Sequence, residues 1–408
     1  MRRFPQSVNC RLMPVAFSSL GMFSRRTNWD RQRNRLAELL EARREEGRPV
    51  YDLTLANPTE LGIEYPAGEL LSALSNPQAL RYQPDPKGLL SGREAVCQYY
   101  REKGIRVDPS RIFLTAGTSE AYSLIFKLLC NAGESVVVPK PSYPLLDYLA
   151  QVSDVNLGRY HLHYDHEWHL NVDHESAKGA KAIVVVNPHN PTGAFLKRRE
   201  HRDIVRIAQE NRLALIADEV FIDYPLVEDD RRFGSTAGDA EALTFTLNGL
   251  SKLAGLPQMK LGWIVLAGPP SLVTEAMERL EILCDTFLSV NSPVQLALPE
   301  LMRTAGRVRS QILQRVKSNC ETLRKATLDS PCSVLNVEGG WYAILRVPQI
   351  RSDEEWAIQL LEQTGVYLFP GYFFDFVGHK YLVVSLLPDE QTFTYSVHSL
   401  VSIIEQSR

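Results

Sequence analysis

The clearest pattern in the sequence is a series of short apolar runs, rich in β-branched residues, that alternate with amphipathic segments. The runs have the length of single strands and lie at Ser135–Pro139, Ala182–Val186, Leu213–Ala217, Leu243–Leu247 and Leu261–Leu266. A continuous run of this kind suits a strand that is buried on both faces of a parallel sheet. Strands that alternate with helices imply crossover connections, so we predict an α/β fold with a large, doubly wound, mostly parallel sheet.

Helical patterns lie between and around these runs. Apolar residues recur at helical spacing among charges from Asp30 to Gly47, and a second helix is predicted over residues 89–104. Residues 112–130 are typical of a strand, a tight turn and a helix. A long helical region is predicted from residue 271 to about Arg324. These segments supply the helical layers that must cover such a sheet.

The C-terminal part of the chain has a different character. Two apolar runs, Gly339–Leu345 and Tyr381–Leu386, are predicted strands with helical segments around them, which indicates a smaller α+β domain. The length of 408 residues allows for two cores. The expected parts are an N-terminal arm at 1–29, which is a candidate for disorder, a small domain at 30–66 and 305–408, and a large domain at 67–304.

Composition narrows the classes of function. The formal net charge is −3, whereas a nucleic-acid-binding surface needs a basic excess. No uninterrupted apolar run reaches the ~20 residues that cross a bilayer. The six cysteines are scattered without a C-x-x-C pair, so we expect buried, reduced thiols and a cytoplasmic protein.

The N-terminus is basic. Its first 26 residues contain Arg2, Arg3, Arg11, Arg25 and Arg26, and no acid occurs before Asp30. This composition is found in organellar transit peptides. A flexible arm, or an over-extended start with Met22 as the true initiator, explains it as well, so these alternatives stay open.

A polar turn follows the first predicted strand of the large domain. The segment Leu114-Thr115-Ala116-Gly117-Thr118-Ser119-Glu120 leads from a strand into a helix. Gly117 allows close backbone approach, and free N–H groups at a helix start attract an anion. The hydroxyl groups of Thr118 and Ser119 add donors. The segment therefore predicts a phosphate site, although ordinary helix capping gives the same pattern.

An amine and an acid follow two later strands. Lys252 comes directly after Asn248-Gly249-Leu250-Ser251, and Asp218 ends the run Leu213–Ala217. Burial near a second cation, Lys260, would lower the pKa of Lys252 and make it a nucleophile. A carboxylate at the tip of an apolar strand needs a cationic partner, either in a salt bridge or in a protonated pyridine ring. Because ligands gather at the carboxyl ends of such strands, we expect these groups to meet.

A histidine-rich stretch raises the question of a metal site. His161, His163, His166 and His169 alternate with apolar and acidic residues. Their spacing fits no common metal-binding motif, and the stretch is typical of a strand with an exposed polar turn. We therefore expect no metal there.

Together the motifs resemble the class I/II aminotransferases of pyridoxal phosphate (PLP) fold type I, from about residue 30 to the C-terminus. The resemblance implies that Lys252 forms a Schiff base with the cofactor and shuttles protons, and that Asp218 pairs with the pyridine nitrogen. It implies that Asn190, in Asn190-Pro191-Thr192-Gly193, binds the ring oxygen. Tyr143, in Pro141-Ser142-Tyr143-Pro144, matches the aromatic residue that stacks on the ring.

The resemblance also assigns the phosphate contacts and an oligomeric state. The groups it places at the phosphate are Gly117, Thr118, Ser119, Ser251 and Lys260. Lys260 stands where the family usually has an arginine, so a point charge replaces a planar fork. Tyr82, in Tyr82-Gln83-Pro84, matches a tyrosine that reaches the phosphate of the neighbouring subunit. This match implies a homodimer with shared active sites.

Two further positions, near the cofactor and the substrate, depart from the family pattern. Phe221 replaces a tyrosine that donates to the ring oxygen, and its loss should raise the pKa of the Schiff base. Tyr224 is a candidate to compensate. Val383 occupies the position of the arginine that usually holds the substrate α-carboxylate, two residues before a Ser or Asn. No arginine occurs between Ser352 and Ser407, so a shift of register cannot supply one.

Recognition of the α-carboxylate must then use other groups. The candidates are Asn57, Asn190 and Lys380, although Lys380 would point to the opposite face of its strand from Val383. We hypothesise that the enzyme does not bind common amino acids in the usual bidentate way. An unusual substrate would satisfy the same observation.

The leading interpretation is a PLP-dependent aminotransferase that moves an amino group between an amino acid and a 2-oxo acid by a ping-pong mechanism through a Lys252 Schiff base. The alternative is β-elimination from a sulfur amino acid on the same scaffold, because a fold does not fix a reaction. A third reading is a regulator that has lost catalysis. The chain has no room for a DNA-binding module and keeps Lys252 and Asp218, which argues against a regulator. The sequence does not identify the amino donor or acceptor.

Overall fold

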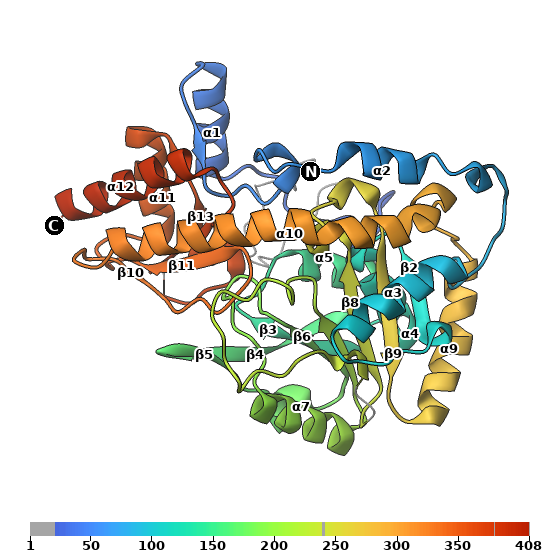
Figure 1. Ribbon diagram of the computed structural model, residues 1–408. Coiled ribbons are helices and arrows are strands. Elements are labelled where there is room, and N and C mark those ends of the chain that lie inside the picture. Colours follow the sequence, from blue (N-terminus) through green and yellow to red (C-terminus); the bar gives the residue numbers. More distant parts are fainter. Residues whose placement is uncertain (1–20, 239–240, 379, 408) are drawn as a thin grey trace.

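A computed structural model describes residues 21–238, 241–378 and 380–407 and shows a large sheet with helices on both faces, beside a smaller sheet (Figure 1). In the described residues the large sheet has the strand order β2-β9-β8-β7-β6-β3-β4-β5. Its strands are β2 (Ile112–Thr115), β3 (Ser135–Lys140), β4 (Asn156–Asp165), β5 (Glu167–Leu170), β6 (Ala180–Val186), β7 (Ala214–Asp218), β8 (Thr244–Gly249) and β9 (Gly262–Ala267). The predicted α/β class and the predicted strands of the large domain are thereby confirmed.

Most neighbouring strands of this sheet are parallel, as expected. The pairs β8–β7, β7–β6, β6–β3 and β3–β4 are parallel, whereas β9 is antiparallel to both β8 and β2. The connection from β8 to β9 contains the short helix α8 (Leu250–Leu253) and one 3-10 turn, and an antiparallel pair needs no long crossover. The histidine-rich stretch forms the β4–β5 hairpin, with His166 in its turn at φ 58°.

The central strands are buried on both faces, which explains their continuous apolar runs. On β6, Ala182 and Val184 pack with the helices α4 (Thr118–Leu129), α5 (Leu145–Val152) and α9 (Pro270–Asp285). The alternate residues Ile183 and Val185 pack on the other side, with α6 (His174–Ala177) and α7 (Arg198–Asn211). Successive side chains of a strand point to opposite faces, and here both sets are apolar. Both faces are therefore covered, as expected for an interior strand of a three-layer fold.

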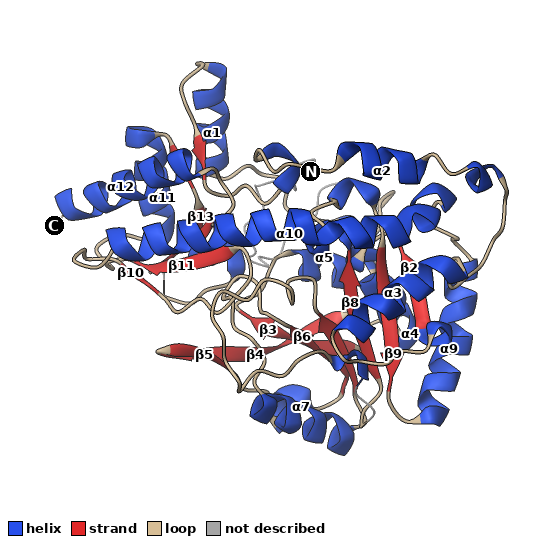
Figure 2. Cartoon of the chain, viewed as in Figure 1, coloured by secondary structure: helices blue, strands red, loops and turns tan. Residues whose placement is uncertain are grey.

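The smaller sheet is antiparallel and has the order β10-β11-β14-β13 (Figure 2). Its strands are β10 (Ser333–Val334), β11 (Tyr342–Arg346), β13 (Phe369–Pro370) and β14 (Tyr381–Ser385), and a separate parallel pair joins β1 (Tyr51–Asp52) to β12 (Val366–Tyr367). Helices α1 (Arg35–Glu45), α11 (Asp353–Thr364) and α12 (Glu390–Gln406) belong to this part of the chain. The two C-terminal runs predicted as strands thus become the neighbours β11 and β14.

The helices differ from the predicted bounds at their ends. Helix α1 begins five residues later than the predicted segment, because the side chain of Asn34 caps it by accepting from the N–H of Ala37 at 2.8 Å. The second predicted helix is α3 (Leu90–Glu102). The long helical region is two helices, α9 and α10 (Ser292–Ala326), since Leu288 takes a left-handed conformation and Asn291 starts a new cap.

Helix α10 connects the two parts of the molecule. It packs against α2 (Ala67–Leu74) and α3 beside the large sheet, and against α12 beside the small one. We propose that the boundary between the two domains falls within this helix, near residues 304–305, with 30–66 and 305–408 in the small domain and 67–304 in the large one. The large sheet lies on one side of this boundary in the sequence and the small antiparallel sheet on the other.

The described end of the N-terminal arm, residues 21–29, lies against α5. The indole N–H of Trp29 donates to Gln151 at 2.7 Å, and its ring meets Tyr148 edge-on at 5.6 Å. Residues 1–20, with most of the basic residues of the predicted arm, lie outside the described residues. Of the described helices, none is long and apolar enough to cross a membrane.

Gly193, directly after Asn190-Pro191-Thr192, should be irreplaceable because two backbones meet there. Its φ is +73°, and a Cβ atom would lie 2.5 Å from the carbonyl oxygen of Gly339. Gly47 has a similar φ of +68° but open space around it. We expect G193A to lower the free energy of unfolding by about 1–3 kcal/mol more than G47A, because only the former adds a clash to the strained backbone. Urea unfolding followed by circular dichroism measures both, and equal losses would contradict the described approach of the two segments.

Candidate active site

The predicted site residues lie at one edge of the large sheet. Asp218 ends β7, Lys252 follows the end of β8, Asn190 follows β6, and Tyr143 follows β3. Because β3, β6, β7 and β8 run parallel, their carboxyl ends reach the same edge. Side chains from four different strand ends are therefore brought to the place where α/β sheets bind ligands.

Asp218 and Lys252 form the centre of this site, and both side chains are half-buried. Asp218 accepts hydrogen bonds from the hydroxyl of Tyr122 at 3.1 Å and from the backbone N–H of Val220 at 3.2 Å. Burial raises the pKa of Asp218 to about 6, although the two hydrogen bonds and the charge of Lys252 oppose the rise. Burial lowers the pKa of Lys252 to about 8, against the attraction of Asp218. Each charge is thus poorly solvated and would gain from a partner.

Aromatic rings surround the amine of Lys252. Its Nζ atom lies 4.4 Å from the ring centroid of Trp341 and 5.4 Å from that of Phe221. The hydroxyl of Tyr224 donates to the backbone carbonyl of Lys252 at 2.6 Å. Because Tyr224 already has this partner, it holds the lysine backbone, and its hydroxyl is not available to replace the one that Phe221 lacks.

The turn before α4 has the shape of an anion cradle. Gly117 stands at the helix start with φ 133°, a conformation that side chains rarely adopt. Next to it lies Gly262 of β9, where a Cβ atom would come within 3.1 Å of the Gly117 Cα. Thr118 is the first residue of α4, and Ser119 is exposed. Free N–H groups therefore face an open space at the start of a 12-residue helix.

The four remaining predicted phosphate and substrate residues differ in exposure and in their contacts. Lys260 is exposed and adopts a left-handed conformation two residues before Gly262, and Ser251 is half-buried beside Lys252. Tyr82 is 82% exposed and lines a surface groove with Glu120 of the first turn of α4. The side-chain oxygen of Asn57 accepts from the backbone N–H and the hydroxyl of Thr59, at 3.3 and 2.8 Å.

Val383 is fully buried in β14, where it pairs with Ile344 and Phe369. Partners across strands share a face, so Tyr342, two residues from Ile344, points to the same side as Val383. The ring of Tyr342 lies 6.3 Å from Phe374, which lies 6.3 Å from Tyr143. The face that carries Val383 is thus the face of Tyr342, which Phe374 links to Tyr143.

Two residues of the site were missed or left open by the sequence analysis. Tyr122 lies one helical turn after Thr118, so helical spacing could have placed it on the same face of α4. Trp341 was predicted only as part of the apolar run Gly339–Leu345, with no link to the site. Only the fold brings it to Lys252, 89 residues earlier in the chain.

Residues 52–400 match the family described as aminotransferase class I and II, and the chain belongs to this family. It is a PLP-dependent aminotransferase of fold type I. The predicted family, cofactor and reaction type are confirmed, and the elimination reading is not favoured.

Relatives with assigned names are also aminotransferases. The chain is 30% identical to the glutamate–pyruvate aminotransferase AlaA of Haemophilus influenzae. The match extends over 355 residues, which are 84% of this chain and 88% of AlaA. It is 27% identical to an alanine aminotransferase of Mycobacterium tuberculosis, over 89% of this chain and 87% of that one. The structure of an aminotransferase from Escherichia coli has a TM-score of 0.80 at 28% identity, covering 91% and 95% of the two chains.

The residues present at the sheet edge fit this cofactor. The side-chain oxygen of Asn190 is buried and has no hydrogen-bond donor among the described residues, so this amide is not fully satisfied by the protein. The amide N–H group on the same side chain is the donor that a ring oxygen would need. The open cradle at Gly117 suits a phosphate, and Asp218 and Lys252 have the chemistry for a pyridine nitrogen and an aldehyde.

The raised pKa of Asp218 predicts a pH-dependent gain of stability in the D218N apoenzyme. The folded-state pKa of about 6 lies above the ~3.9 of an unfolded aspartate, so the ionised carboxyl destabilises the fold. This penalty is complete above pH 6 and fades as the pH falls from about 6 to about 4. We expect D218N to be more stable than the wild type by about 2 kcal/mol at pH 8 and by about half of that at pH 5.

Melting temperatures without PLP at the two pH values measure this difference. D173N is the matched control, because Asp173 caps α6 and its pKa is lowered, so it stays ionised at both pH values. The same stability difference for D218N at pH 5 and pH 8 would contradict the assignment.

Proposed function

We propose that Lys252 is the amine that joins the cofactor and that Asp218 is the partner of the pyridine nitrogen. The observation that carries this proposal is the placement of these two groups at the ends of adjacent strands, with pKa values of about 8 and about 6. A buried carboxylate gains a cationic partner when it meets a protonated ring nitrogen. When bound, PLP supplies an electron sink for charge that develops at the substrate α-carbon.

In this proposal Lys252 also moves the proton. Its Nζ atom would take the proton from the α-carbon of a bound substrate, hold it and give it up again, while the bound cofactor would supply the electron sink. A pKa of about 8 leaves part of the amine neutral near pH 7.5, so it can act as a base and then as an acid. The bond from Tyr224 to the lysine backbone fixes the position from which the side chain swings.

Further residues of the site would contact the cofactor ring and its phosphate. We propose that Asn190 binds the ring oxygen, that Tyr143 covers the ring, and that the phosphate lies at the start of α4. The phosphate contacts would come from Gly117, Thr118, Ser119, Ser251 and Lys260. The N-terminus of α4 and the positive charge of Lys260 both favour an anion there.

We further propose a homodimer in the cytoplasm. Tyr82 would reach the phosphate of the neighbouring subunit, and its 82% exposure leaves it free to do so. The described cysteines Cys97, Cys130, Cys284, Cys320 and Cys332 carry free thiols, which suits a reducing compartment.

For the substrates we propose a small amino acid and a 2-oxo acid. Glutamate, alanine and pyruvate are the first to try, because the named relatives are glutamate–pyruvate and alanine aminotransferases. Without an arginine at Val383, the carboxylate would depend on uncharged donors such as the amides of Asn57 and Asn190. This dependence predicts weak binding of simple amino acids.

The absorbance spectrum of the holoenzyme tests the reaction. We expect a near-visible band that bleaches to a pyridoxamine-like band when one amino acid of a panel is added, and that returns with a 2-oxo acid, since the two halves of a ping-pong reaction are separable. K252A should lack the initial band and the response. Release of ammonia and an oxo acid from a sulfur amino acid, without a second substrate, would instead favour elimination.

Replacing Val383 tests the role of the missing cation. V383R should lower the KM for alanine about tenfold or more, because a bidentate arginine–carboxylate pair replaces uncharged contacts. V383M is the control, since it adds length without charge in the same buried position. If a folded V383R shows no lower KM than V383M, the missing arginine does not limit substrate binding.

A further inference from the structure

Trp341 reaches the catalytic lysine from the other domain. It lies just before β11 of the small sheet and is fully buried, yet its ring centroid is 4.4 Å from the Nζ atom of Lys252. It also meets Phe221 edge-on at 5.3 Å and Tyr224 edge-on at 5.1 Å. The amine therefore lies close to one ring from each domain, Phe221 and Trp341.

We propose that Trp341 is a positioning residue for transamination, which holds the Lys252 amine by a cation–π contact, and that Glu338 acts through Trp341 by fixing it to the large domain. The proposal rests on the assignment of Lys252 as the reacting amine. A cation over an indole face is attracted by the ring quadrupole, and the attraction is stronger where water is excluded.

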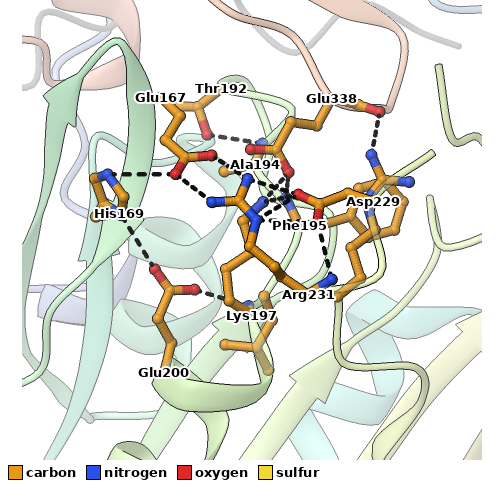
Figure 3. A network of polar contacts seen from close by, with 12 residues as sticks. Glu167, His169, Thr192, Ala194, Phe195, Lys197, Glu200, Asp229, Arg231 and Glu338 are labelled. Atoms are coloured by element: carbon orange, nitrogen blue, oxygen red, sulfur yellow. Dashed lines mark hydrogen bonds and ion pairs between the residues drawn. The ribbon is translucent and has the colours of Figure 1, made fainter. Parts of the chain in front are cut away.

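Glu338 is the anchor of the segment that carries Trp341. Its carboxylate accepts from the backbone N–H of Phe195 at 3.1 Å and forms a buried ion pair with Lys197 (Figure 3). Both partners directly follow the Asn190-Pro191-Thr192-Gly193 turn of the large domain. The charged pair is thus a fixed point between the two domains, three residues from the indole.

The backbone around Glu338 is equally fixed. The Glu338 carbonyl accepts from the N–H of Leu226 at 2.8 Å, and the N–H of Gly340 donates to the carbonyl of Tyr224 at 3.0 Å. At Gly339 a Cβ atom would lie 2.4 Å from the ring of Phe195 and 2.7 Å from the Tyr224 carbonyl oxygen. Residues 338–340 therefore lie directly on residues 224–226, which also carry the tyrosine that holds the Lys252 backbone.

A wider ionic network supports the anchor. Lys197 lies 3.6 Å from Asp229, and Asp229 is bound by Arg231 at 2.8 Å. Arg231 also pairs with both carboxylate oxygens of Glu167 on the β4–β5 hairpin at 2.8 Å. Figure 3 shows Glu167, Arg231, Asp229, Lys197 and Glu338 gathered in one network of polar contacts. The network keeps Lys197 in place and so fixes the geometry of its pair with Glu338.

The charged and titratable groups that face Lys252 are few. Asp218 acts on it from β7, with the Tyr122 hydroxyl bonded to that carboxylate, and Tyr224 contacts its backbone. Burial lowers the pKa of Lys252, Asp218 raises it, and a cation–π contact adds to the upward side. Removing the indole face should therefore make the amine lose its proton at lower pH.

The test follows the lysine in the apoenzyme. The rate at which the near-visible band develops after mixing with PLP is measured from pH 6 to pH 10, because only the neutral amine reacts. The titrations of PLP itself are the same for all variants and cancel in their differences. We expect W341L to lower the apparent pKa of Lys252 by about half a unit to one unit, and W341F, which keeps a ring face, to lie between W341L and the wild type.

The same profile with E338Q tests the anchor. E338Q should lower the apparent pKa in the wild-type background and have no further effect in the W341L background, because its influence passes through the indole. E321Q, which breaks the exposed Glu321–Lys325 pair on α10, is the matched control and should have no effect.

Each result has a distinct meaning. An unchanged or raised apparent pKa in W341L would overturn the proposal, since the ring would then act only as a wall that excludes water. An E338Q shift that persists in the W341L background would overturn the role of Glu338. If the wild type forms no band at all, or K252A forms the same band, the failure lies in the assignment of Lys252 and not in that of Trp341.

Discussion

The structure depends on holding an acid and an amine at the carboxyl ends of two buried parallel strands. Asp218 ends β7 and Lys252 follows β8, and both strands are buried on both faces, so the polar groups at their ends have little water around them. The resulting pKa shifts bring the two groups toward each other's range, to about 6 and about 8. The helices that cover the sheet create this environment, and the same helices present an N-terminus at Gly117 for an anion.

The sequence was enough for the fold and for the residues that end strands. A run such as Ala182–Val186 has only one stable environment, the interior of a parallel sheet, and the motifs that follow such runs are then brought together by the sheet itself. Helix ends were predicted less well, since they depend on single side chains such as Asn34 and Asn291. The antiparallel direction of β9 was not visible, because an apolar run carries no information on direction.

The role of Trp341 and the partner of Tyr224 could not be predicted for a different reason. Both depend on contacts between separate segments of the chain, and no local pattern records which of these segments meets Lys252. Local rules were sufficient where chemistry follows a strand end and insufficient where separate segments meet. Phe221, one of the departures from the family pattern, makes a contact of this second kind, because it meets Trp341 edge-on.

Helix α10 has a mechanical consequence for the whole molecule. It is one continuous helix of 35 residues, about 50 Å long at the usual rise, and it lies along both domains. Because one continuous helix contacts both parts of the molecule, the proposed small domain cannot rotate independently of it. Such a rotation must either move the N-terminal half of α10 against α2 and α3 or bend the helix. Pro299 lacks the N–H that an interior position normally donates, which makes the half beside the large domain the weaker one. A change in the angle between the two sheets would therefore bend α10 near Pro299 first.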